Sequence, residues 1–228
     1  MTRSSSLLTI FVVLLSCCYA QAQVISVSFA GDNAGGGLNF NLASDTAGVV
    51  PVSNWTSDEF QLASGSHSNL VDDSGAATTA GVTWSGSANT WGGTPPGDPV
   101  PTGHEYMVNG WLDDNGDGAL VNVTGIPYSI YDVYVYGSSD GGNQGAGLTT
   151  RVNGTDYFSG GEFTNLSANG SFFAPDTYVN ASSTNPDPTY FKIGGVTGSA
   201  LEIFGLRATG PALPGGGTTY RGGVSGFQ

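Results

Sequence analysis

Apolar residues recur at every second position in short runs along this chain, and clusters rich in glycine, asparagine and proline separate the runs. In the first run, residues 24–29, Ile25, Val27 and Phe29 alternate with serines, which is the pattern of a half-buried strand. No segment carries apolar residues at helical spacing over three turns, so parallel strands would lack the crossover helices that they need. We therefore expect an all-β fold, an antiparallel two-sheet β-sandwich of jelly-roll type, with a closed barrel as the alternative.

The same pattern predicts about a dozen short strands. Two stretches interrupt it, residues 85–103 and 137–147, and because both are rich in glycine or proline we expect long surface loops there. After the first run, the expected strands cover residues 38–42, 49–52, 59–62, 81–85, 120–123, 131–136, 149–152, 155–158, 189–193, 200–204 and 224–228.

The N-terminus has the three parts of a secretory signal peptide: basic Arg3, an apolar run over residues 7–15 and an Ala20-Gln21-Ala22 cleavage pattern. We expect residues 1–22 to be removed, which leaves residues 23–228 as a single β-sandwich domain that is secreted and extracellular. Both cysteines, Cys17 and Cys18, lie in the leader, so the mature domain forms no disulfide. A lipoprotein acylated at Cys17 is the alternative.

The chain is strongly acidic, with 18 acidic residues, 5 basic residues and a formal net charge of −13. One of the basic residues is Arg3 in the leader, so the mature chain is more acidic still. Such a surface repels phosphate backbones and anionic lipids, which argues against nucleic-acid binding. After residue 22 no apolar stretch is long enough to cross a bilayer, so we expect no membrane insertion of the mature chain.

A short acidic motif over residues 113–118 predicts a calcium site. Side-chain oxygens of Asp113, Asn115 and Asp117 at alternate positions converge on one point, and the carbonyl of Ala119 is the next ligand. An EF-hand would place a glutamate where Thr124 stands, so we expect a calcium loop between strands. A remote carboxylate, Asp132 or Asp140, would complete the cage; an ion-free hairpin turn is the alternative.

Aromatic residues are the second functional signal, because a sugar ring stacks its C–H face on an indole or phenol. Trp91 and Trp111 stand next to expected loops, and Tyr134 and Tyr136 lie on the face of the 131–136 strand opposite Val133. These four residues are the expected carbohydrate-binding set. The alternative is that these aromatic side chains are ordinary core and strand residues.

Catalytic motifs are weak in this sequence. His104 and Glu105 begin a zinc-protease pattern that fails at Val108, and there is no nucleophile elbow. His67 and His104 are the two imidazoles, each better explained as a surface histidine. A pair of carboxylates could hydrolyse a glycosidic bond, so a polysaccharide hydrolase remains an alternative to a non-catalytic module.

Six segments carry a resemblance to a known family: residues 25–31, 47–55, 70–76, 107–113, 126–136 and 222–228. Taken in order, they resemble uncharacterised exported bacterial proteins whose characteristic partner is a C-terminal PEP-CTERM sorting signal. The resemblance implies a jelly-roll sandwich similar to carbohydrate-binding modules, presented at a cell surface or in an extracellular matrix, and it implies no catalytic residues. No Pro-Glu-Pro segment, transmembrane helix or basic tail follows Gln228, so free secretion and a truncated chain are both open.

These observations lead to one expected function and two alternatives. We expect a non-catalytic extracellular binding module that recognises a glycan or polysaccharide and is stabilised by calcium. The first alternative is a structural surface or matrix protein that self-assembles through exposed strand edges. The second is the polysaccharide hydrolase.

Overall fold

The computed structural model describes ten segments of the chain, and these form thirteen strands and no helix. The described residues are 23–29, 46–57, 64–85, 87–92, 110–114, 119–137, 147–152, 155–158, 190–206 and 223–228. The strands are β1 (Val27–Ser28), β2 (Thr56–Ser57), β3 (Gly65–His67), β4 (Gly81–Ser85), β5 (Ser87–Gly92), β6 (Gly110–Asp114), β7 (Ala119–Thr124), β8 (Tyr131–Gly137), β9 (Gly147–Val152), β10 (Thr155–Phe158), β11 (Tyr190–Val196), β12 (Ala200–Leu206) and β13 (Gly223–Phe227). An all-β fold is thereby confirmed for this part of the chain.

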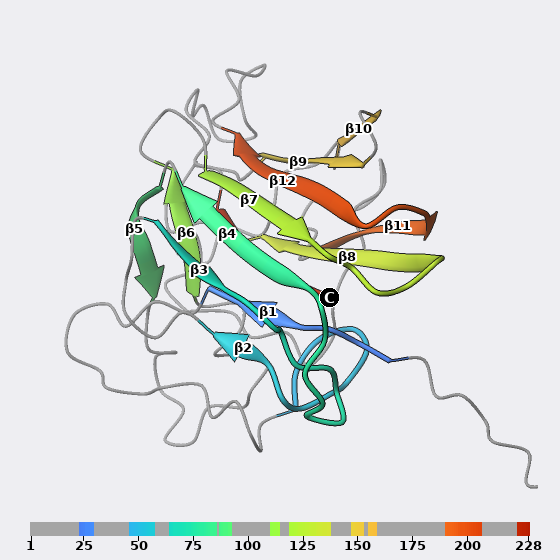
Figure 1. Ribbon diagram of the computed structural model, residues 1–228. Coiled ribbons are helices and arrows are strands. Elements are labelled where there is room, and N and C mark those ends of the chain that lie inside the picture. Colours follow the sequence, from blue (N-terminus) through green and yellow to red (C-terminus); the bar gives the residue numbers. More distant parts are fainter. Residues whose placement is uncertain are drawn as a thin grey trace, which may run out of the picture.

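The strands form two sheets (Figure 1). The first, here called the β13 sheet, has the order β11-β8-β13-β1-β2, with β6 also pairing with β13 and β5 pairing with β6. The second, the β7 sheet, has the order β10-β9-β12-β7-β4-β3. Neighbouring strands are antiparallel throughout, as expected, except that β1 and β2 run parallel.

One apolar core joins the two sheets. Val133, Val135 and Phe227 come from the β13 sheet, and Val121 and Ile203 come from the β7 sheet. Because side chains alternate across a strand, each sheet presents one apolar face, and the two faces pack together in a sandwich-like arrangement. Full burial of each such side chain contributes about 1.5–3 kcal/mol, so the core is the main source of stability in the described part.

A second, smaller cluster covers the other face of the β13 sheet. It consists of Ala47, Trp55 and Tyr136, with the Nε1–H of Trp55 donating to the carbonyl of Val52 at 2.9 Å. The 49–52 stretch, expected to be a strand, is instead a turn closed by an Ala47–Val52 bridge. This turn packs against the β13 sheet. The strand expected at residues 24–29, predicted to be half-buried, lies beneath the turn and is buried on both faces, since Ser26 and Ser28 are as inaccessible as Val27.

Most expected strands with described residues are confirmed, with small shifts at their ends; β4 and β10 match their expected bounds. The expected loop over residues 85–103 is wrong in its first part, where β5 pairs with β6. Strands β2, β3 and β6 were not expected. The expected strands at 38–42 and 59–62, and the leader, lie outside the described residues. Within the described residues, no helix is long and apolar enough to span a membrane.

Candidate functional site

Two tyrosine-bearing strands, β8 and β11, lie side by side and form a surface of aromatic and charged side chains. The register places Tyr190 opposite Tyr136 and Lys192 opposite Tyr134. The Tyr134 and Tyr190 rings are half-buried, and their centroids are 6.1 Å apart. We call Asp132, Tyr134, Tyr190 and Lys192 the tyrosine surface.

An ion pair forms the polar part of the tyrosine surface. Lys192 Nζ lies 2.6 Å from Asp132 Oδ2, and the two side chains remain 39% and 42% exposed, so both charges stay accessible to a ligand. The backbone N–H of Gly195 donates to Asp132 Oδ1 at 2.9 Å, which fixes the carboxylate. Lys192 Nζ also lies 5.2 Å from the centroid of the Tyr134 ring, a cation–π distance.

The two charges of this pair stabilise each other. The hydrogen bond from Lys192, followed by that from Gly195, lowers the pKa of Asp132 below its usual value. The hydrogen bond to Asp132 is the largest cause that raises the pKa of Lys192 to about 12. Both groups are therefore charged at neutral pH, and the surface offers one anionic and one cationic hydrogen-bonding group next to an aromatic ring.

A cavity of about 560 Å³ opens beside the tyrosine surface, at the end of the sandwich where β8 begins. Its lining is mainly apolar and comes from both sheets, for example Val133 and Leu201. The buried hydroxyls of two lining residues, Tyr128 and Tyr131, have no hydrogen-bond partner among the described residues. Burial raises the pKa of both phenols, so they are neutral donors at neutral pH.

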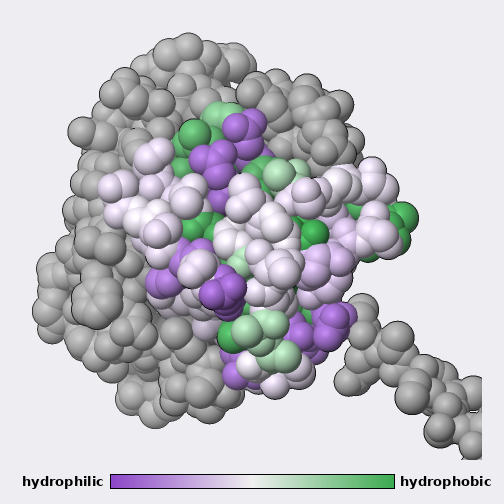
Figure 2. All heavy atoms as spheres, viewed as in Figure 1, coloured by the Kyte–Doolittle hydropathy of each residue, from purple (hydrophilic) through white to green (hydrophobic). Residues whose placement is uncertain are grey.

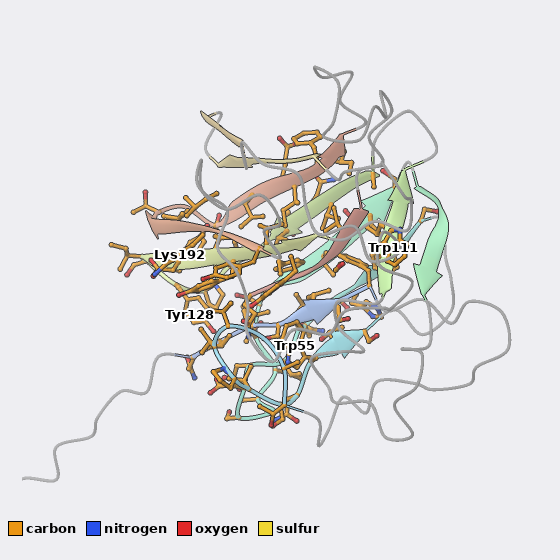
Figure 3. All side chains as sticks on the ribbon, turned by 180° about the vertical axis from the view of Figure 1, so that it is seen from behind. Trp55, Trp111, Tyr128 and Lys192 are labelled. Carbon is orange, nitrogen blue, oxygen red and sulfur yellow. The ribbon has the colours of Figure 1, made fainter. Side chains whose placement is uncertain are left out.

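Figure 3 shows Lys192 and Tyr128 at one end of the sheet and Trp111 toward the other. The cavity and the Asp132–Lys192 pair thus lie at the end of the molecule away from Trp111. The opposite face of the molecule, seen in Figure 2, mixes hydrophilic and hydrophobic residues over its described part, without a continuous apolar patch there. The β8 end is therefore the better candidate site.

The expected sugar-binding residues fall in three different environments. Trp111 is 1% exposed and Tyr136 is fully buried, so neither ring offers a face to a sugar from solvent; their burial fits the core alternative. Trp55 and Trp84 are buried as well. Tyr134 lies on the tyrosine surface. Trp91 pairs with Trp111 in the β5–β6 ladder, and its side chain is outside the described part.

The predicted calcium loop joins β6 to β7. Asp113 lies near the end of β6, opposite Gly223 of β13, and Ala119 begins β7. The loop residues Asn115 and Asp117 lie outside the described residues. β6 and β7 belong to different sheets and do not pair with each other, so the strands on either side of the loop do not form a hairpin.

The remote carboxylate cannot be Asp132. Asp113 lies opposite Gly223, next to Val224, which pairs with Gly137 at the far end of β8. Asp132 stands five positions before Gly137 along β8, which is about 17 Å at 3.3 Å per residue. Asp140 follows the end of β8 that lies near Asp113, but it is outside the described residues. Among the described residues, no group of three or more His, Cys, Asp or Glu side chains is placed to hold a metal ion.

Sequence reasoning missed four residues of this region: Tyr128, Tyr131, Tyr190 and Lys192. Tyr190 and Lys192 stand two apart in an expected strand, so a shared face was predictable from period-two alternation. Their pairing with β8 was not predictable, because it depends on which strands become neighbours. The comparisons with protein-family models, with curated proteins and with solved structures found no match to this chain.

Proposed function

We propose that this chain is a non-catalytic, extracellular carbohydrate-binding module with a jelly-roll arrangement of its two sheets, and that it binds glycan at the tyrosine surface. The observation that carries the proposal is the placement of the Tyr134 and Tyr190 rings beside the exposed Asp132–Lys192 pair. The leader-like N-terminus supports an extracellular location.

The chemistry of these groups suits a sugar. A pyranose has an apolar C–H face that packs on a phenol ring, and its edge carries hydroxyls that donate to a carboxylate and accept from an ammonium group. Asp132 and Lys192 supply these two polar partners within one ion pair. Because both partners are held by β8 and β11, little side-chain ordering is needed on binding, which favours affinity.

Calcium has a structural role in this proposal. The ligands Asp113, Asn115, Asp117 and the carbonyl of Ala119 would hold it, with Asp140 as the completing carboxylate. This position is near the Gly137 end of β8, whereas Asp132 is near its start. The ion would therefore stabilise the connection between β6 and β7 without touching the glycan.

A glycan array tests the proposal. Wild-type protein should bind a reproducible group of glycans, and Tyr134→Ala and Lys192→Ala should each reduce the signal at least tenfold. Thr83→Ala is the matched control, because Thr83 is exposed on β4 of the other sheet and should leave binding unchanged. Absence of reproducible binding by the wild type, or equal binding by all four proteins, would overturn the proposal.

A further inference from the structure

A bulge in β11 fixes the carboxylate of Asp132 on the tyrosine surface. The β8–β11 register shifts between Ile193 and Val196, which indicates a β-bulge there. Within the bulge Gly195 has φ +68°, a conformation that favours glycine, and its N–H donates to Asp132 Oδ1 at 2.9 Å. A Cβ atom at Gly194 would lie 3.3 Å from the same oxygen, so glycine there leaves the carboxylate uncrowded. The bulge therefore anchors one oxygen of Asp132 while the side chain stays exposed.

The second partner of Asp132 is Lys192, the only lysine in the chain (Figure 3). Besides its hydrogen bond to Asp132, Lys192 makes one to the side chain of Tyr134, which is the next cause that raises its pKa. An ammonium group has three N–H donors, so one remains for a ligand. A carboxylate has about four acceptor positions, of which Gly195 and Lys192 occupy two. Counted over the described residues, the pair thus offers a ligand one donor and about two acceptor positions.

This balance suits hydroxyl groups better than a second carboxylate. A hydroxyl both donates and accepts, so one hydroxyl can donate to Asp132 while it accepts from Lys192, and an adjacent hydroxyl can donate to Asp132 as well. A uronate or sulfate group only accepts, so it would find a single donor, on Lys192. It would also lie next to the charge of Asp132, whose Oδ2 is 2.6 Å from Lys192 Nζ, and the two anions would repel each other. The formal net charge of −13 adds to this repulsion.

We infer that the tyrosine surface selects neutral sugars through two adjacent hydroxyls, and that Asp132 excludes glycans that place a carboxylate or sulfate group there. The inference rests on the proposed function and names its class of ligand. The sugar ring packs on Tyr134, one hydroxyl bridges Asp132 and Lys192, and its neighbour donates to Asp132. Asp132 is thus the residue that determines charge specificity.

Three matched forms of the same sugar test the inference. The probes are hexasaccharides of glucose, galactose and mannose, each with its C6 groups as alcohols, as carboxylates or as carboxamides. The carboxamide form is the control, because it lacks the C6 hydroxyl just as the carboxylate form does but is neutral. In calorimetry at about 0.01 M salt, at least one neutral hexasaccharide should bind, and its carboxylate form should bind at least tenfold more weakly than its carboxamide form. Because both charges of the pair are exposed, this ratio should shrink at about 1 M salt.

Two charge-removing variants locate the selectivity. Asp132→Asn keeps the shape of the side chain and leaves Lys192 unpaired, so the ratio of carboxamide to carboxylate affinity should fall at least threefold. Glu202→Gln is the matched control, because it removes one negative charge from the outer face of the β7 sheet, where Leu201 and Ile203 on either side of Glu202 point into the core. Its ratio should stay at the wild-type value. An unchanged ratio in Asp132→Asn, or an equal fall in both variants, would overturn the inference.

The outcomes separate this inference from the proposed function. Equal binding of the carboxylate and carboxamide forms by the wild type, or tighter binding of the carboxylate form, overturns the inference and leaves glycan binding at the tyrosine surface intact. If none of the hexasaccharides binds, the inference is overturned as well, whereas the proposed function is overturned only if the glycan array also shows no binding.

Discussion

The hydroxyl of Tyr136 donates a 2.5 Å hydrogen bond to the side-chain oxygen of Gln228, a residue 92 positions later in the chain. The same hydroxyl accepts a 2.7 Å hydrogen bond from the backbone N–H of Val49. Gln228 completes the arrangement by donating to the carbonyl of Val50 at 2.8 Å and to the hydroxyl of Ser26 at 3.2 Å. This buried network joins three parts of the chain: the C-terminal end of β13, strand β8 and the turn segment at residues 46–57.

Replacement of Tyr136 by phenylalanine should lower the free energy of unfolding by about 1–3 kcal/mol, because the Val49 N–H and the Gln228 side-chain oxygen each lose a hydrogen bond while the ring volume stays nearly the same. Urea denaturation measures the change. Tyr134→Phe is the matched control on the same strand face, and since its ring is half-buried we expect a change within about 0.5 kcal/mol. Equal losses in the two variants would show that the network adds little.

Replacement of Trp111 by alanine separates stability from ligand binding. Trp111 is 1% exposed, so we expect a loss of about 3–5 kcal/mol in unfolding free energy through the cavity created. Glycan affinity per folded molecule should not change. Thermal melting and calorimetry under conditions where the variant stays folded test the two parts, and Trp111→Phe provides a milder variant if Trp111→Ala does not fold. A selective loss of affinity in either folded variant would return Trp111 to the binding set.

The buried carboxylate of Asp72 should make stability depend on pH. The Ser74 hydroxyl, at 2.6 Å from Oδ1, is the largest cause that lowers the pKa of Asp72, and the N–H groups of Ser74 and Ala76 add to it. A pKa lowered by folding stabilises the protein above the unfolded value of about 3.9, and this stabilisation is lost as pH falls through the folded value.

Asp72→Asn should therefore be less stable than wild type by about 1–3 kcal/mol at pH 7. The difference should shrink as pH falls below about 4, where the wild-type carboxylate becomes protonated. Urea denaturation of both proteins over a pH series measures it. A difference that stays constant from neutral to acid pH would mean that the charge of Asp72 does not contribute.

Period-two alternation was a reliable guide where a strand has one apolar face. In β8 it placed Val133 and Val135 on one face and Tyr134 on the other, because side-chain direction follows from the backbone alone, and the structure shows that the valine face packs into the core. It failed for β5, whose residues have little local strand preference; β5 exists because it pairs with β6. It failed again at residues 49–52, where Gly48 adopts φ +92° and starts a turn.

The candidate site was predictable only in part, because it depends on strand neighbours and register. Tyr134 was identified from its strand, but its neighbours Tyr190 and Lys192 reach it through the β8–β11 pairing. Asp132 likewise lies far from Asp113 because of the direction in which β8 runs. The short sequence separation between Asp132 and the predicted calcium loop does not reveal that direction. Trp111 is 1% exposed in the folded chain, which no local pattern specified.

Calcium should raise the melting temperature, and EDTA should lower it to the ion-free value. At a calcium concentration 100 times the dissociation constant, the expected stabilisation is about 2.7 kcal/mol. Asp113→Ala and Asp117→Ala should each remove the calcium-dependent shift. Asp132→Ala is the control, because Asp132 lies at the other end of β8 and should keep the shift. Melting that is unchanged by calcium and EDTA in the wild type would exclude this role.

The most direct test of the central claim is titration calorimetry with the best glycan from the array against wild type, Tyr134→Phe and Tyr134→Ala. Phenylalanine preserves the ring on which a sugar packs, so its affinity should stay within about threefold of wild type, whereas alanine should lose at least about tenfold, or 1.4 kcal/mol. Equal affinity in wild type and Tyr134→Ala would contradict glycan binding at the tyrosine surface.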